Sequence, residues 1–72
     1  MIRNISTNRD DYIRFIGMNV RGASLRPVGV VKDVEIWHST HFSEEVMFRL
    51  DNDETFSWRQ IAKIGSEILL NR

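Results

Sequence analysis

The chain has 72 residues, no formal net charge and no cysteine. A chain of this length forms one small domain that buries only about 60% of its unfolded surface, so we expect modest stability. Without cysteine, neither a disulfide nor a thiolate-held zinc ion can supplement the core. The longest apolar run, residues 68–70, is far shorter than the ~20 residues that span a bilayer, and no signal-peptide pattern is present. We therefore expect a cytoplasmic domain without a membrane segment.

Charge is unevenly distributed along the chain. Residues 1–32 hold six basic and two acidic side chains, a net charge of +4, and residues 33–72 hold four basic and eight acidic ones, a net charge of −4. A dipolar surface of this kind can steer a polyanion to one face. The alternative is that folding intersperses the charges over the surface.

A short helix is predicted over residues 8–16. Thr7 and Asp10 have the spacing of a helix start, because the hydroxyl can accept from the backbone three residues on and the carboxylate favours the positive helix end. Helical spacing follows at three apolar positions: Tyr12, Phe15 and Ile16. Gly17 ends the pattern, and we expect the aromatic side chains to cover the core.

Residues 28–36 are predicted to form the central strand, because β-branched residues dominate this run. Residues 18–26 form a first strand and a loop before it. Plain alternation along the central strand would bury the ammonium group of Lys32, which is too costly for so small a core. One bulge at Lys32 and Asp33 turns both charges outward. It places four residues inward: Gly29, Val31, Val34 and Ile36.

A hairpin is predicted next, since apolar residues alternate in two runs: Val46, Phe48 and Leu50, then Phe56 and Trp58. A three-residue loop at 52–54 would pair Leu50 with Phe56 and Phe48 with Trp58, whereas a two-residue loop would break the match. We therefore predict an odd-length loop and a core position for Trp58. The apolar spacing over residues 59–72 fits a helix. Alternatively, residues 59–61 form a tight turn and residues 62–64 a short closing strand. Residues 66–72 are a tail that could be helical.

The order of elements from Gly17 to Gly65 resembles an SH3-like small β-barrel. Gly29 and Val31 are similar to the marker glycine and following valine of the KOW motif of transcription and ribosomal proteins. The resemblance implies a mainly β protein, with an antiparallel barrel over about 17–65 and the closing strand at 62–64. It also implies RNA or DNA binding without catalytic residues. Tudor-type barrels of similar shape use an aromatic cage, for which the candidates would be Trp37, Phe42 and Tyr12.

No catalytic or metal site is predicted. His38 and His41 could share a metal on a helix, but the segment lacks a third ligand and is not convincingly helical, so we expect two solvated loop histidines. Ser39 and Ser43 lie beside them, yet such close neighbours in one loop rarely form a nucleophilic triad. We expect no cofactor and no enzymatic activity.

The functional prediction is a non-catalytic, regulatory binding module for RNA or DNA. The predicted contacts are three cations and one aromatic ring that could stack on a base: Arg21, Arg26, Lys32 and Trp37. The alternative is a protein-interaction module, or a small regulator or inhibitor, that docks a larger complex through its acidic half.

Overall fold

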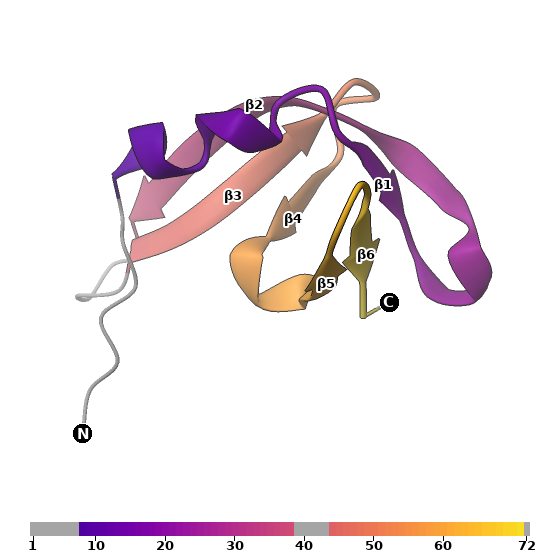
Figure 1. Cartoon of the computed structure of the whole chain (residues 1–72). Helices are drawn as coiled ribbons and strands as arrows, with labels where there is room; N and C mark the ends of the chain where they lie inside the picture. The colour runs from indigo at the N-terminus through magenta and orange to yellow at the C-terminus, as the bar shows by residue number, and fades with distance from the viewer. Residues whose placement is uncertain (1–7, 39–43, 72) are drawn as a thin grey trace.

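A six-stranded sheet accounts for more than half of the residues that the computed structural model describes, which are 8–38 and 44–71. Its strands lie in the order β4-β3-β2-β1-β6-β5, as Figure 1 shows. The strands are β1 (Asn19–Arg21), β2 (Pro27–His38), β3 (Glu44–Leu50), β4 (Thr55–Ser57), β5 (Ile61–Ile64) and β6 (Ile68–Leu70). The prediction of a mainly β protein is confirmed. An antiparallel barrel is not shown, because β1 and β6 are parallel and the end strands β4 and β5 are not paired with each other.

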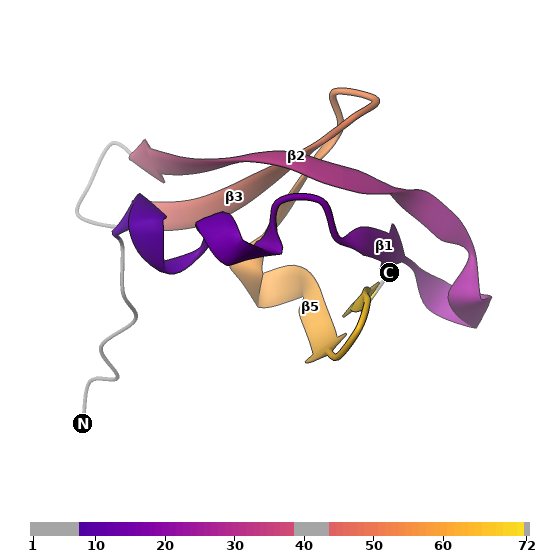
Figure 2. The ribbon, with the colours of Figure 1, turned by 45° about the horizontal axis from the view of Figure 1, so that its top comes forward.

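The central strand carries the predicted bulge. Val31 lies opposite Leu50 and Asp33 lies opposite Arg49, so Lys32 is the extra residue on β2. Val31 and Val34 are both buried while Lys32 is exposed. The bulge therefore keeps the ammonium group in water, as the cost of burying it requires. β2 is longer than predicted, and Figure 2 shows it running beside β3 along the molecule.

The β3–β4 hairpin has an odd loop of three residues, at 51–53 rather than 52–54. Phe48 consequently pairs with Phe56, and both predicted pairings, of Leu50 with Phe56 and of Phe48 with Trp58, are wrong. The backbone N–H of Leu50 donates to the carbonyl of Glu54 at 2.8 Å, which closes the loop one residue early. Asp53 occupies the left-handed position with φ of 69°, which aspartate tolerates better than most residues.

Trp58 lies on a 3-10 turn, η4 (Trp58–Gln60), instead of extending β4. The Ser57 hydroxyl accepts from the Arg59 N–H, and the Gln60 side chain accepts from the Ser57 N–H, forming a capping box that ends the strand. The indole is partly buried and packs against Tyr12, with ring centroids 5.1 Å apart. Trp58 was predicted to lie in the core, but it lies only at the core's edge. The tight turn predicted at 59–61 is present one residue earlier, at Trp58–Gln60.

The C-terminal tail is a strand and not a helix. Ile68 and Leu70 of β6 are buried, and Val20 of β1 pairs with Ile68 in parallel. The predicted closing strand exists as β5, but it pairs with β6 and lies at the edge of the sheet. A short apolar run fits either a strand or a helix, and only the partner strand decides between them.

The predicted N-terminal helix is replaced by two 3-10 turns, η1 (Arg9–Asp11) and η2 (Ile13–Phe15). The Asn8 side chain caps the first by accepting from the Asp10 N–H at 3.0 Å, and Thr7 lies outside the described residues. A third turn, η3 (Ala23–Leu25), joins β1 to β2. In a 3-10 turn, residues three apart share one face, so Tyr12 and Phe15 can still both be buried.

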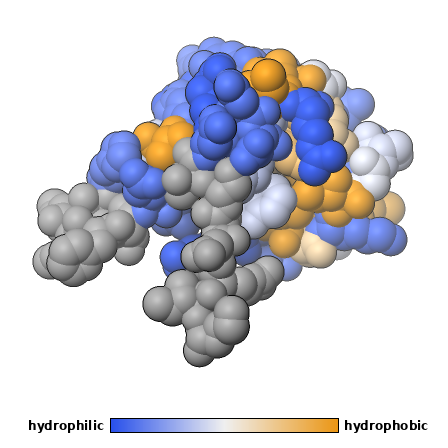
Figure 3. Space-filling model, turned by 60° about the vertical axis from the view of Figure 1, so that its left-hand side comes forward, coloured by the Kyte–Doolittle hydropathy of each residue, from blue (hydrophilic) through white to orange (hydrophobic). Residues whose placement is uncertain are grey.

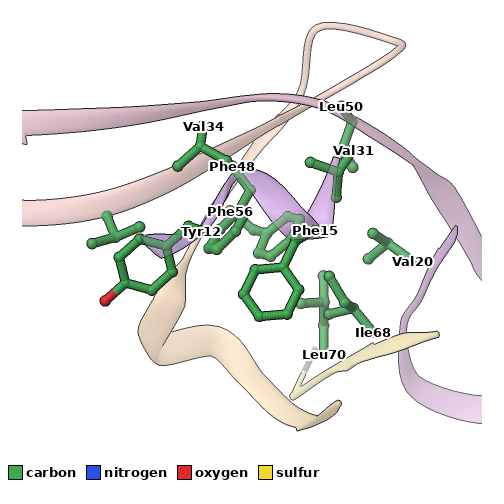
Figure 4. Packing of buried hydrophobic residues seen from close by; sticks show 11 residues of the cluster. Tyr12, Phe15, Val20, Val31, Val34, Phe48, Leu50, Phe56, Ile68 and Leu70 are labelled. Carbon is green, nitrogen blue, oxygen red and sulfur yellow. The ribbon is translucent and has the colours of Figure 1, made fainter. Parts of the chain in front are cut away.

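The core gathers side chains from the N-terminal turns and five of the strands, as Figure 4 shows. Its members are Tyr12, Phe15, Val20, Val31, Val34, Val46, Phe48, Leu50, Phe56, Ile68 and Leu70. Phe48 lies at its centre, stacked on Phe56 with ring centroids 5.0 Å apart and contacting Phe15 edge-on. The N-terminal turns therefore cover the core, as predicted, although without a helix.

Candidate interaction surface

Folding pairs the basic first half of the chain with the acidic second half. The Arg21 Nε atom lies 2.9 Å from Glu67 Oε1, and Lys32 Nζ lies 2.6 Å from Asp53 Oδ1. Arg9 pairs with Asp33 in the same way. The charge asymmetry along the sequence thus becomes an interspersed surface, which is the alternative that the sequence left open.

The four predicted nucleic-acid contacts do not form one patch. Arg21 and Lys32 are engaged by carboxylates, whereas Arg26 is exposed and makes no ion pair within residues 8–38 and 44–71. Trp37 lies near the end of β2, eleven residues beyond Arg26 and therefore about 36 Å along an extended chain at ~3.3 Å per residue. Figure 1 shows the η3 loop and the tip of β2 at opposite ends of the molecule.

Trp37 is an exposed aromatic side chain held in place by its neighbours. Its ring is 43% exposed, and its indole N–H donates to Glu35 at 2.8 Å. Arg49 on β3 donates to both carboxylate oxygens of Glu35, at 2.6 and 3.2 Å. Another Arg49 nitrogen donates to the Asp53 carbonyl at 3.1 Å, which anchors the arrangement to the hairpin loop. The indole is therefore ordered before any partner arrives.

A second hydrogen-bonded group extends this surface toward β4. Glu45, which pairs with Trp37 across the sheet, accepts from the Ser57 hydroxyl at 3.1 Å. It also forms an ion pair with Arg59, whose Nε lies 3.1 Å from Glu45 Oε2. We call the outward surface of β2, β3 and β4, together with Arg59 of η4, the Trp37 face. It comprises Glu35, Trp37, Glu45, Met47, Arg49, Ser57 and Arg59. Figure 3 brings the left side of Figure 1 forward and shows hydrophilic residues separating smaller hydrophobic patches.

The ion pair at the centre of the Trp37 face shifts the pKa values of both its members. The Arg49 guanidinium, and then the Trp37 indole N–H, hold the pKa of Glu35 below its ordinary value of 4.5. The Glu35 carboxylate in turn raises the pKa of Arg49. Hydrogen bonding to the ionised carboxylate favours the charged form, so the network is intact at neutral pH.

Acid should weaken the fold through this network. Because Glu35 binds a proton less readily when folded than when unfolded, its contribution is present above pH 4.5 and is lost as the pH falls through the lower folded-state pKa. Asp33, paired with Arg9, and Asp53, paired with Lys32, act in the same direction: their contributions are present above pH 3.8 and are lost as the pH falls below it. Urea unfolding at a series of pH values should show this decline, and Glu35→Gln should flatten it. If the stability of Glu35→Gln declined with pH in the same way as that of the parent, the decline would not come from Glu35.

The other sequence candidates are only partly described. His38 Nδ1 lies 3.1 Å from Glu44 Oε2, while Ser39, His41, Phe42 and Ser43 lie outside the described residues. Tyr12 is buried in the core and so does not join Trp37 in a cage. Within the described part of the chain, no cluster of three or more potential metal ligands occurs, and no helix there has the length and apolarity to cross a membrane.

Sequence alone missed the partners that order Trp37. The alternation of residues 46–50 does turn Met47 and Arg49 outward, but it does not show that Arg49 reaches Glu35 on the neighbouring strand.

No protein-family model matches the chain, and no curated protein matches it significantly. The similarity of Gly29 and Val31 to a KOW motif therefore stays a prediction.

Proposed function

We propose that the chain is a non-catalytic binding module that docks a partner protein through the Trp37 face. The observation that carries the proposal is an indole that is 43% exposed and yet fixed by Glu35, which Arg49 holds in turn. A pre-ordered aromatic ring loses little conformational entropy on binding. Tryptophan, methionine and arginine are also the residues enriched at the centres of protein interfaces.

The charges favour a protein over a nucleic acid as the partner. On the Trp37 face, Glu35 and Glu45 balance Arg49 and Arg59, so no positive excess attracts phosphate groups. Away from this face, Arg21 and Lys32 already bind carboxylates. A nucleic acid would have to displace these intramolecular partners, whereas a protein can dock on the indole without breaking them.

Trp37→Ala should weaken partner binding about 30-fold, which corresponds to the roughly 2 kcal/mol lost with a central interface aromatic. The test is recovery of a stoichiometric partner from nuclease-treated lysate, followed by titration of that partner against both forms. Ile13→Ala is a matched control, because Ile13 is also 43% exposed but lies on η2.

Equal partner affinity for Trp37→Ala and the parent would contradict the proposal. So would tight binding of single-stranded RNA or DNA at low salt that Arg26→Glu abolishes, since that result would favour the nucleic-acid alternative. Arg21→Glu is unsuitable for this comparison, because the new carboxylate would face Glu67 and disturb the contact between β1 and β6.

A further inference from the structure

A hollow of about 310 Å³ lies between the η3 loop and the β5–β6 hairpin. It is lined by Leu25, Lys63, Gly65, Ser66, Glu67 and Leu69. Leu69 is the outward residue of β6, between the buried Ile68 and Leu70, and Leu25 forms an apolar wall that is 62% exposed. The hollow thus offers an apolar surface that the core does not use.

Leu25 holds an unfavourable backbone conformation. Ser24 and Leu25 have φ angles of 61° and 60°, a left-handed region that glycine or asparagine adopts with less strain. The leucine is also more exposed than any other large apolar residue in the described chain. A strained residue whose side chain stays outside the core points to a role other than stability.

Arg21 fixes the loop above the hollow. Its Nη1 atom donates to the Leu25 carbonyl at 3.0 Å, and its Nε atom donates to Glu67 at 2.9 Å. The guanidinium therefore ties the strained loop to the start of β6. A ligand would meet a preformed hollow, and would not need to order it.

The rim of the hollow carries uncompensated positive charge. Arg21 neutralises Glu67, while Lys63 has no ion-pair partner among the residues described. Arg26, which follows Leu25, is likewise exposed and without such a partner in those ranges. Lys63 lies opposite Leu69 in the pairing of β5 with β6, so its ammonium group flanks the apolar surface of the hollow.

We propose that the hollow binds an extended peptide in which an apolar side chain lies between acidic ones. The apolar side chain packs on Leu25 and Leu69, and the carboxylates approach Lys63 and Arg26. This site lies at the other end of β2 from the Trp37 face, so it does not depend on the function proposed above.

The test uses a fluorescein-labelled peptide that alternates leucine and valine with glutamate, and a counterpart with lysine in place of glutamate. Anisotropy should show the acidic peptide binding at least about tenfold more tightly than its counterpart. Lys63→Gln should remove most of that preference and Lys63→Arg should retain it. Lys32→Gln is the matched control, because Lys32 is an exposed lysine that already pairs with Asp53.

Leu25→Gly separates binding from folding. It should raise the melting temperature by relieving strain, while it weakens the acidic peptide about tenfold or more. Amide shifts in spectra of the labelled domain should map to Leu25 and residues 63–69, and Trp37→Ala should leave the affinity unchanged. The proposal is overturned if neither peptide binds or if Lys63→Gln binds as well as the parent. Displacement of the peptide by single-stranded DNA would also overturn it.

Discussion

Replacing Phe48 by alanine should destabilise the fold by about 3–5 kcal/mol, the range for truncating a buried aromatic side chain. Phe48 is fully buried and stacks on Phe56 with ring centroids 5.0 Å apart. It also contacts Tyr12 and Phe15 of the N-terminal turns at 6.1 and 5.9 Å. The cavity would open where the sheet meets these turns, so neither side could collapse to fill it. A domain this small has little stability in reserve.

Urea unfolding followed by tryptophan fluorescence measures the effect. Trp58→Ala, followed by circular dichroism, is the comparison, and it should cost less than Phe48→Ala because the indole is only partly buried at the edge of the same cluster. If Trp58→Ala proved as damaging as Phe48→Ala, the core would be centred on η4 and not on β3. An unchanged midpoint for Phe48→Ala would contradict the packing described above.

Gly29→Ala should destabilise the domain by about 1–3 kcal/mol, as overpacking typically does. A Cβ atom at this position would lie 2.9 Å from Asp51 Oδ1 and 3.3 Å from Leu50 Cβ. The Asp51 carboxylate accepts from the backbone N–H of Val30 at 3.2 Å, so moving it away would weaken the contact between β2 and the hairpin loop. The structure therefore explains the glycine at position 29: β2 approaches the end of β3 so closely there that a side chain would not fit without displacing its neighbours.

Gly65→Ala is the control for Gly29→Ala. A Cβ atom at Gly65 meets nothing within 4 Å, so the substitution should leave stability unchanged or raise it slightly by reducing the freedom of the unfolded chain. Thermal unfolding of the two variants compares them directly. Equal melting temperatures would show that the space around Gly29 is not limiting.

The two proposed surfaces would allow the chain to bind a partner protein and an acidic peptide at the same time. The hollow beside Leu25 lies near the first residues of β2, whereas Trp37 lies near its last ones. Figure 1 shows the two ends of this strand far apart. Trp37→Ala and Lys63→Gln address one surface each, and each should leave binding at the other surface unchanged because the two sites share no residue. RNA or DNA binding through Arg26 stays a prediction. Titration of the parent and of Arg26→Glu with single-stranded RNA or DNA at low salt tests it.

The sequence by itself determined which residues of β2 and β3 face inward, and it determined the bulge at Lys32 in β2. Residues alternate between the two faces of a strand, and burying the Lys32 ammonium would cost more than this core can offset, so only one register was possible for Val31 and Val34. The same alternation in β3 required an odd loop for Phe48 and Phe56 to share a face. The loop began one residue earlier than predicted, because the Leu50–Glu54 hydrogen bond and the left-handed Asp53 depend on the folded hairpin.

Only the tertiary structure decided the roles of the chain ends and of the charges. Residues 68–70 fit a strand or a helix, and β1 selected the strand by offering unpaired backbone groups beside Ile68. Arg21 and Glu67 are 46 positions apart in the sequence, and Lys32 and Asp53 are 21 apart, so no local pattern reveals that the members of each pair neutralise one another. Surface charge depends on which strands become neighbours, whereas the burial pattern of a strand depends mainly on its own residues.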